Sequence, residues 1–524
     1  MFHKSIISLL VCLAIIGSPD ATACARRVII KADTPSKELF KQSKVTYIIK
    51  GIVDLHGKTY IIPEGCTLSF KHGSLVNGTI IGDKTKFKSV KPNTIGALLS
   101  GSWQCESFSD LYFNSDYLTD NQIMSSINAL QSDDIKQEFL LERAEYNCDI
   151  PKNDGALLLL SSNTMLRNSS SISINGNNFT SYNIIRIKGK ENVTVTGGEL
   201  HGDVGEHIYS LTNSSQWGHG INIYDSQNVT ISDIIITHCI GDGLAISGGK
   251  EQSIGDYSFA SSKVYIRNVK CDYNRRQGLS IIHATDVDIC YCFISNTGQI
   301  DGHSPSAGID IEPNVQAPYF QSVKNVAINN CIMENNKGYG FLTYNNMENM
   351  EGKFSIENIL VSNCSIDTRV VLYSGGVKFE DSQINQLSFI SEKAPLSGNS
   401  FIRCTIAGFS GIVFKCSKSS YDHQGKISDI VFNSCDISFK EDTGNQSYGG
   451  LFVGKGNTSN IKNIVLHNCK ITIPLNIGPS AVLMDKAEGF IELENCEIHM
   501  PRRRFPTSKI RHNNCIIESQ NIYE

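Results

Sequence analysis

Short runs of alternating apolar and polar residues recur along most of this chain. Each unit begins with an Asn-Val or Asn-Ile pair, often continues through Asn-Cys, and ends with a Gly that precedes an apolar-x-apolar segment. Alternation with a period of two over a few residues predicts a short strand with one buried side. The clearest units begin at Gln227, Lys263, Asp286, Asn325 and Asn358, and weaker ones lie near Ile430, Ile464 and Phe490.

These repeats predict a solenoid. The units recur at irregular intervals of roughly 20 to 40 residues, as expected when insertions loop out from a constant unit. No unit can bury its apolar side alone, so neighbours must stack as rungs roughly 4.8 Å apart. A β-sandwich or propeller is disfavoured because Asn-Gly hairpin turns between equal strands are scarce. We therefore predict an all-β fold, a single right-handed parallel β-helix.

The two ends of the chain depart from this repeat. Gly57–Cys66 and Gly73–Gly82 are typical of irregular first rungs. Asn121–Leu130 has helical periodicity, and we expect this helix to cover the open end of the coil, where unpaired strand edges would aggregate. The apolar residues on one side of this helix are Ile123, Ile127 and Leu130. The expected divisions are a signal peptide (1–23), irregular rungs with a helical cap (24–150), the β-helix (151–500) and a tail with a basic run (501–524).

The N-terminus has the features of an export signal. Lys4 precedes the apolar run Ile6–Gly17, and Ala21-Thr22-Ala23 forms a small-x-small cleavage site. The run is too short to span a bilayer. Cys24 follows the cleavage site directly, so a lipid anchor there is an alternative to release. We expect an exported protein that is periplasmic, extracellular or on the cell surface.

The charge of the chain limits the classes of partner that it is expected to bind. The net charge of −5, from 47 Lys and Arg against 52 Asp and Glu, suggests neither nucleic acid nor an anionic membrane. Of the 17 cysteines, five recur at one fixed place in the repeat, after Asn330, Asn363, Ser434, Asn468 and Asn495. We interpret them as small buried residues in a ladder rather than as disulfides. The Asn that precedes them suits a turn.

Four consecutive units share one motif. They are Gly218–Ile223, Gly241–Ile246, Arg276–Ile281 and Ala307–Glu312. The motif resembles the pectin-lyase-like superfamily of β-helices, which includes pectate lyases, polygalacturonases, epimerases and phage tailspikes. It is most similar to exported bacterial members with Asn-Arg-Arg-Gln-Gly and Gly-Ile-Asp-Ile-Glu-Pro-Asn. The resemblance in fold extends over most of the chain, whereas the shared motifs are confined to residues 218–314. It implies a carbohydrate substrate but does not indicate which reaction takes place.

The chain lacks the catalytic set of the polygalacturonases. Those enzymes place a carboxylate, an Asp pair, a His and an Arg/Lys pair on the four successive rungs. The corresponding places here hold His219, Asp242, Gln277 and the acidic pair Asp310 and Glu312. Polygalacturonase chemistry is therefore not expected.

The alternation indicates which side chains gather. With the Gly of each motif as reference, the next apolar residue points inward and the one after it outward. Asn222, Ser280, Asp310 and Glu312 should share one outer face, with His219, Asp242 and Gln277 at the turn just before it. The expected catalytic residues are Asp242, Asp310, Glu312 and His219. The expected substrate-binding residues are Arg275, Arg276, Gln277, Trp217, Asn222, Tyr339 and Tyr344.

Insertions at 203–217, 248–262, 298–306 and 314–322 would wall a cleft there. We expect a polysaccharide or oligosaccharide partner and no cofactor. Calcium is a weaker alternative, with Asp203, Glu206 and Asp301 as oxygen ligands.

The reaction stays open at this stage. A hydrolase needs two carboxylates flanking the bond, whereas a lyase or epimerase needs a cation for a uronate carboxylate and a base. Hydrolysis of a polysaccharide is the leading expectation. A non-catalytic glycan-binding or adhesin β-helix would use the same strip to hold sugar hydroxyls. Asp242, which lies between two glycines, also suits a plain turn residue.

Overall fold

The computed structural model describes most of the chain. The described residues are 26–210, 215–249, 260–314, 321–344, 355–392, 395–408, 411–416, 425–439, 452–456, 460–473, 482–483, 491–501 and 510–520. The expected signal segment and Cys24 lie outside them, as do most of the insertions 248–262 and 314–322 and the basic run Arg502–Arg504.

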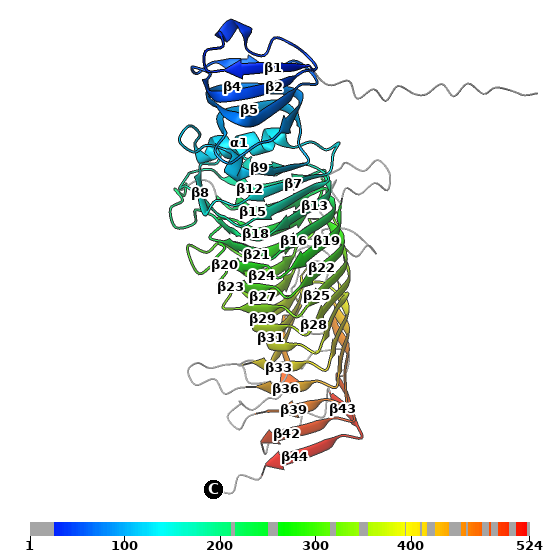
Figure 1. The fold of residues 1–524 in the computed structure, drawn as a ribbon. Coiled ribbons are helices and arrows are strands. Elements are labelled where there is room, and N and C mark those ends of the chain that lie inside the picture. The colour runs from blue at the N-terminus through cyan, green and yellow to red at the C-terminus, as the bar shows by residue number, and fades with distance from the viewer. Residues whose placement is uncertain are drawn as a thin grey trace, which may run out of the picture.

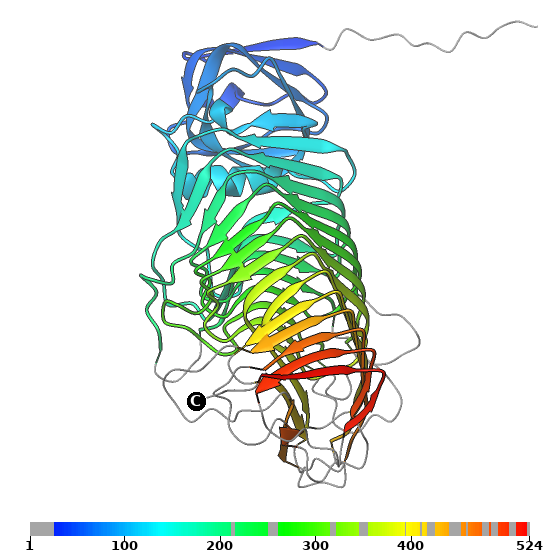
Figure 2. The same cartoon turned by 90° about the horizontal axis from the view of Figure 1, so that it is seen from below.

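Parallel strands stack along one axis into a rod, and the rungs wind around a common interior (Figures 1 and 2). One side is a 15-stranded sheet that runs from β6 (Ser107–Ser109) to β43 (Ile510–Asn513). A 24-stranded sheet forms the other two sides, and its two runs of strands join at β29 (Ser365–Leu372) and β31 (Gln383–Ser391). This topology confirms the predicted all-β parallel solenoid.

One run of strands carries the motifs. Each strand pairs in parallel with the next along the chain of rungs. These strands are β9 (Gly155–Leu160), β12 (Ser181–Lys188), β15 (Trp217–Tyr224), β18 (Asp242–Ser247), β21 (Gln277–Ile281), β24 (Ala307–Ile311) and β27 (Tyr339–Thr343).

The interior is a continuous ladder of Ile, Val, Leu, Phe and Cys. The described cysteines are free, and all but the half-buried Cys515 are buried. Many thiols donate to the carbonyl two residues earlier, as Cys331 Sγ does to Asn329 O (3.3 Å) and Cys364 Sγ does to Ser362 O (3.2 Å). The repeated cysteine therefore fills the core and satisfies its thiol locally, in agreement with the ladder interpretation.

Asparagine makes the turns between faces. The Asn residues before the cysteines have positive φ, for example 55° at Asn330 and 52° at Asn363. Asn tolerates this left-handed conformation better than most residues. A second set links rungs through its side chains: Asn228 Nδ2 donates to Asn192 Oδ1 (2.8 Å), and Asn192 Nδ2 donates in turn to Asn163 Oδ1 (2.9 Å). The Asn pattern thus marks many of the corners of the coil.

The Gly of each motif lies in a close stack. A Cβ built on Gly220 would lie 2.7 Å from Gly243 O, and one on Gly243 would lie 2.7 Å from Gly278 O. The same approach continues from Gly278 to Gly308 O, at 2.8 Å, and from Gly308 to Gly340 O, at 2.6 Å. These contacts are closer than any side chain allows, so each rung needs glycine at this place.

Gly278→Ala is therefore expected to lower the free energy of unfolding by about 1 to 3 kcal/mol. Its Cβ would also meet Ile294 Cγ2 at 2.2 Å, inside the packed core. Gly205→Ala is the matched control, because a Cβ there meets no atom within 4 Å. Urea unfolding followed by circular dichroism measures both, and equal losses would contradict the steric account.

A separate five-stranded sheet precedes the main coil. It pairs β1 (Arg27–Lys31), β2 (Thr46–Asp54), β4 (Thr67–Lys88), β3 (Thr59–Ile61) and β5 (Ile95–Gln104), all in parallel. The helix α1 (Asp120–Leu130) lies between this sheet and β9 (Figure 1). Its Ile123, Ile127 and Leu130 are buried, as the periodicity predicted. The helix closes the main coil from inside the molecule, because the five-stranded sheet extends the rod beyond it.

The other end also continues further than the expected boundary at residue 500. β43 pairs with β41 (Ile491–Glu494), and β44 (Ile516–Gln520) pairs with β42 (Glu497–Pro501). The segment expected as a tail thus adds a rung. Among the described residues, no helix has the length and apolar character needed to cross a bilayer.

Candidate functional site

The outer side of the run β9 to β27 carries two rows of side chains, most of which are buried beneath neighbouring side chains. In β12, Ile184 and Ile185 both lie in the core, so Asn183 and Arg186 flank them on the outside. In the later strands a glycine occupies the first of the two inward positions. A Cβ built on Gly243, for example, would point at the core atom Cys271 Sγ. The residue before the glycine and the second residue after it therefore share one face.

The strand register confirms this arrangement. The first row is Asn183, His219, Asp242, Gln277, Ala307 and Tyr339. The second row is Arg186, Asn222, Ala245, Ser280, Asp310 and Leu342. The predicted outer face of Asn222, Ser280 and Asp310 is thus present, and the residues expected at the turn join it.

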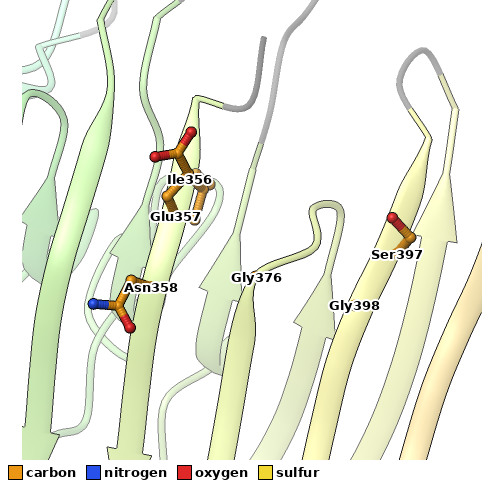
Figure 3. Close-up of a pocket in the computed structure, with 6 residues that line it drawn as sticks. All are labelled: Ile356, Glu357, Asn358, Gly376, Ser397 and Gly398. Atoms are coloured by element: carbon orange, nitrogen blue, oxygen red, sulfur yellow. The ribbon is translucent and has the colours of Figure 1, made fainter. Parts of the chain in front are cut away.

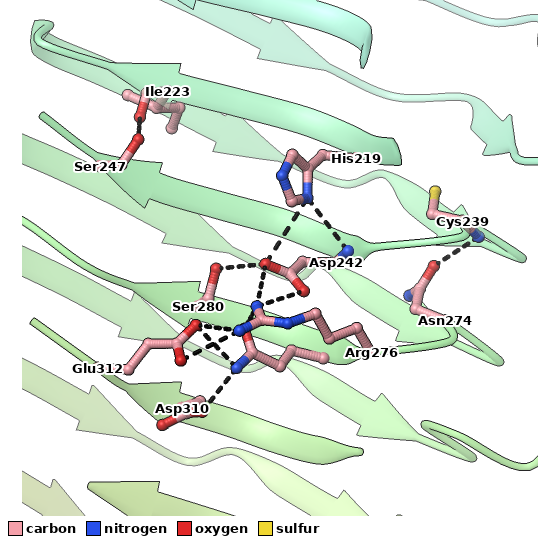
Figure 4. Close-up of polar contacts among 11 residues, drawn as sticks. His219, Ile223, Cys239, Asp242, Ser247, Asn274, Arg276, Ser280, Asp310 and Glu312 are labelled. Atoms are coloured by element: carbon pink, nitrogen blue, oxygen red, sulfur yellow. Dashed lines mark hydrogen bonds and ion pairs between the residues drawn. The ribbon is translucent and has the colours of Figure 1, made fainter. Parts of the chain in front are cut away.

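Arg276 is the centre of a polar cluster on this face (Figure 4). Its Nη1 lies 3.3 Å from each oxygen of Asp242, and its Nη2 donates to Glu312 at 2.8 and 3.1 Å. Nη1 also donates to Gln277 Oε1 (2.8 Å). One guanidinium thus bridges the carboxylates of Asp242 and Glu312.

Gln277 links the other acids. Its Nε2 donates to Asp310 Oδ2 (2.6 Å) and to Glu312 Oε1 (3.0 Å). One amide thus holds two carboxyl groups that come from alternate positions near the end of β24. Oδ1 of Asp310 is buried and has no hydrogen-bond partner in the described part of the chain.

His219 and Ser280 complete the cluster around Asp242. Ser280 Oγ donates to Asp242 Oδ2 (2.8 Å). The backbone N–H of Asp242 donates to His219 Nδ1 (3.1 Å), which therefore carries no proton. The neutral ring then bears its proton on Nε2, so His219 is arranged as a hydrogen-bond donor on that side rather than as a base.

Burial and neighbouring charges shift the pKa values of the cluster residues in different directions. Burial and the neighbouring Glu312 raise the pKa of Asp310 well above its usual value. Burial also raises the pKa of Glu312, with a further contribution from Asp242 and a smaller net effect because Arg276 opposes it. Burial lowers the pKa of His219 and keeps the ring neutral. Burial opposes the charge of Arg276, but Asp242 and Glu312 outweigh it and raise the pKa of the guanidinium.

Exposure distinguishes the acids that solvent can reach. Asp242 and Asp310 are 0% and 1% exposed, whereas the side chain of Glu312 is 19% exposed. Trp217 lies at the edge with 42% exposure, and its ring is 5.0 Å from the guanidinium carbon of Arg276. Of the three expected catalytic acids, Glu312 is the one that a bound molecule can contact directly.

The acidity of Asp310 predicts a pH dependence of stability. The folded chain keeps a proton that the unfolded chain releases near its ordinary pKa of 3.8. The contribution of Asp310 is therefore fully present below about pH 4 and is lost as the pH rises through the raised folded-state pKa. We expect the wild-type chain to lose stability relative to Asp310→Asn as the pH rises from acid to neutral.

Urea midpoints of both proteins across that pH range test this expectation. Asp381→Asn is the control, because Arg403 lowers the pKa of the exposed Asp381. The contribution of a lowered carboxyl is lost as the pH falls, so the control should shift in the opposite direction. A constant difference between wild type and Asp310→Asn would contradict the prediction.

Arg275 lies apart from the cluster, although it neighbours Arg276 in sequence. Its Nε donates to Asp301 O (2.8 Å), its Nη1 donates to Ser215 O, and the guanidinium lies 4.4 Å from the ring centre of Tyr209. Arg275 thus ties the two insertions 203–217 and 298–306 to the coil.

The remaining expected binding residues surround the acids. Asn222 lies in the second row, and its buried Oδ1 has no partner among the described residues. Tyr339 is half-buried beneath the guanidinium of Arg369, at 5.6 Å. Tyr344 is 37% exposed and packs edge-on against Tyr373, with ring centres 5.3 Å apart. The tyrosines therefore flank Glu312 on the side opposite Trp217.

A second buried network was not foreseen from the sequence. Asp203, considered above as a calcium ligand, accepts hydrogen bonds from the hydroxyl of Tyr182, from His207 Nδ1 (2.8 Å) and from Asn177 Nδ2 (2.8 Å). These contacts anchor the insertion 203–217, and the sequence offers no signal for them. Among the described residues, no group of three His, Cys, Asp or Glu is arranged for a metal ion.

Two hollows lie farther along the rod. One, of about 270 Å³, lies on the 15-stranded side, and Figure 3 shows its lining of Ile356, Glu357, Asn358, Gly376, Ser397 and Gly398. The other, of about 230 Å³, lies just beyond the acids at the turn before β27. It is lined by Asn336, Lys337, Gly338, Thr368, Arg369, Asn385 and Gln386. The second hollow continues the polar surface from Glu312 past Tyr339.

Comparisons with known proteins describe the fold more than the reaction. No family model matches the chain. The uncharacterized protein YclG of Bacillus subtilis is 27% identical over 290 residues, 52% of this chain and 48% of that protein. The prophage-derived YorA of the same bacterium, also uncharacterized, is 28% identical over 220 residues, 39% of this chain and 36% of that protein. The chain thus matches less than half the length of either relative.

Several solved structures are similar at low identity. The catalytic domain of Agl-KA has a TM-score of 0.47 and 12% identity, covering 80% of this chain and 69% of that chain. The A-module of the mannuronan C-5 epimerase AlgE4 from Azotobacter vinelandii has a TM-score of 0.39 and 11% identity, with coverage of 75% and 96%. An exopolygalacturonase from Thermotoga maritima has a TM-score of 0.38 and 10% identity, with coverage of 73% and 84%. Identities this low concern the fold alone. The wound parallel rungs identify the fold of this chain as a right-handed parallel β-helix.

Proposed function

We propose that this chain hydrolyses a polysaccharide, with Glu312 as the proton donor to the glycosidic oxygen. The observation that carries the proposal is the position of Glu312. It is the acid of the cluster that reaches solvent, and its pKa is raised. A carboxyl group with a raised pKa is protonated closer to neutral pH, as a general acid requires.

The other polar groups position this acid. Gln277 holds the carboxyls of Asp310 and Glu312 together, so the two share their protons. Arg276 fixes the orientation of Glu312 and is itself held by Asp242. We therefore assign Asp242, which is fully buried, as a positioning residue, and Asp310, which Gln277 holds beside Glu312, as the second carboxyl group that hydrolysis requires.

The sugar would lie across the face along the rod. Trp217 offers an exposed ring on one side of Glu312, and Tyr344 offers one on the other. Aromatic side chains present flat apolar surface beside a polar edge, which suits sugar rings. The hollow lined by Lys337 and Arg369 would accommodate the chain beyond Tyr339.

The engaged arginines favour hydrolysis over lyase or epimerase chemistry. Those reactions need a cation for the uronate carboxylate and a base for the adjacent carbon. Arg276 is already held by Asp242 and Glu312, and Arg275 is held by backbone carbonyls. His219 receives a backbone N–H at Nδ1, which occupies that nitrogen.

Non-catalytic glycan binding is a second candidate, and the same ion pairs support it. Arg276 ties Asp242 to Glu312, which is the arrangement expected of a binding strip whose acids hold hydroxyl groups. We also propose that the chain is exported, on the strength of the apolar run Ile6–Gly17 and the small residues that follow it.

The test is a panel of plant, algal and host glycans incubated with the protein, with reducing ends and unsaturated uronate absorbance followed in parallel. New reducing ends without absorbance, lost in Asp310→Asn, support hydrolysis. Absorbance would instead indicate a lyase. If neither assay gives a signal but a glycan is retained on an affinity gel, the proposal of an enzyme is rejected and glycan binding without catalysis is supported.

A further inference from the structure

The charge of this protein is distributed unevenly along the rod. Residues 26–104, which include the five-stranded sheet, contain 13 Lys and Arg against 5 Asp and Glu, a net charge of +8. Residues 1–25 contribute one of each sign, which leaves 33 against 46 in residues 105–524, a net charge of −13. The net charge of the whole chain, −5, conceals this separation. Such an asymmetry is typical of an interaction with a surface of opposite charge.

These cations are available to a partner. All 13 are exposed. Within the described residues of this segment, Lys84 is the cation with a carboxylate partner, Glu64 at 3.5 Å. In the β-helix, by contrast, Arg276 and Arg403 each form an ion pair with a carboxylate. The first sheet therefore carries positive charge that the fold does not neutralise.

The strand register places two of these cations, Lys31 and Lys50, side by side, with His72 next to them. Lys31 of β1 pairs with Lys50 of β2, and Lys50 pairs with His72 of β4. Neighbouring strands lie roughly 4.8 Å apart, and like charges at that spacing repel. A row of this kind costs stability unless an external anion offsets it.

Apolar side chains accompany the row. Ile29 alternates with Arg27 and Lys31 along β1 and is 47% exposed. Ile52, two residues after Lys50, is 62% exposed. A soluble polyanion would cover the cations but leave these isoleucines in water. A bilayer surface offers phosphates for the lysines and an apolar boundary for the isoleucines.

We propose that the five-stranded sheet is a docking surface for a bilayer that contains anionic phospholipid. Arg27, Lys31, Lys50 and His72 face the phosphate headgroups, and Ile29 enters the boundary of the acyl region. β1 and β2 lie at one end of the rod, before α1 and the coil (Figures 1 and 2). The protein therefore stands on the membrane by this end, and the acid cluster of Arg276 lies farther along the rod. The proposal is independent of the proposed hydrolysis.

Cosedimentation with vesicles tests it. The chain beginning at Arg26, which retains every residue that the structure describes, is mixed with vesicles of phosphatidylcholine alone or of an equimolar mixture with phosphatidylglycerol. We expect binding to the mixed vesicles at low salt and its loss at high salt, because screening weakens such contacts. Lys31→Gln combined with Lys50→Gln should weaken binding on the order of tenfold. Ile29→Ser should weaken it further.

The matched control is Lys426→Gln combined with Lys462→Gln, which removes the same charge from exposed lysines of the β-helix. It should bind as the unmodified chain does. Equal losses in the two double variants would overturn the assignment to the first sheet. Equal binding to neutral vesicles, no binding to either, or retention by a soluble polysulfate without vesicle binding would overturn the membrane as partner. Circular dichroism of each variant checks the fold.

Discussion

Arg276→Ala is expected to lower the free energy of unfolding by about 3 to 5 kcal/mol. The side chain of Arg276 is 9% exposed and lies between Asp242, which is fully buried, and Glu312. Removal of the guanidinium leaves the charge of Asp242 in a poorly solvated place, with the hydroxyl of Ser280 as its remaining side-chain donor in the described structure. A buried charge without its partner costs far more than a lost surface contact.

Arg403→Ala is the matched control. Arg403 makes two hydrogen bonds of 2.7 Å to Asp381, but both side chains are substantially exposed. Its loss should change stability far less than the loss of Arg276, because water screens an exposed ion pair. The double variant Arg276→Ala/Asp242→Asn should recover part of the loss, because the uncompensated charge is then gone. Urea midpoints of the four proteins decide the matter; equal effects of the two arginine variants would show that the buried cluster is not an energetic unit.

Glu312→Gln is expected to reduce the rate of glycan cleavage by about 10² to 10⁴. Glutamine preserves the size of the side chain but cannot give a proton to a leaving oxygen. The wild-type rate should fall as the pH rises through the raised pKa of Glu312, because the acid must be protonated to act. The measurement is kcat on the glycan identified by the panel, across pH.

Glu357→Gln is the control for this variant. Glu357 pairs with Lys324 at 3.0 Å on the 15-stranded side, away from the cluster. It should leave the rate and its pH profile unchanged. If Glu312→Gln retains full activity while its fold is intact, Glu312 is not the proton donor and the proposed mechanism fails.

The rung architecture could be predicted from the sequence because one pattern repeats and each repeat must satisfy the same packing. The glycine reference correctly placed Asn222, Ser280 and Asp310 in one row. The observed rows also show why the residue before the glycine lies on the same face: two inward positions occur in succession. These properties depend on the backbone alone, which a local pattern describes well.

The chemistry of the cluster depended on information that the pattern does not carry. Arg275 and Arg276 are adjacent, yet one binds carbonyls of the insertions and the other binds the acids. Nothing in two neighbouring arginines reveals which way each side chain turns. The burial of Asp242 has the same origin, because Arg276 lies against it from another rung.

The segments outside the regular repeat were also less predictable. The helix α1 was recognisable from its periodicity, but its place between two stacks depends on how the five-stranded sheet associates. The last strands, β43 and β44, are short and follow a basic run, so their pairing had no strong signal of its own.

The glycine stack between β15 and β27 bears on how such a protein can evolve. Elsewhere along the rod, duplication of a whole rung adds one more layer with the same Asn corners and leaves its neighbours undisturbed. Between β18 and β24, a duplicated rung would move Asp242 away from Glu312 by one layer, roughly 4.8 Å, and Arg276 would no longer reach both. Rungs can thus be added or lost at the ends of the rod during evolution, whereas the three rungs from β18 to β24 must be kept together.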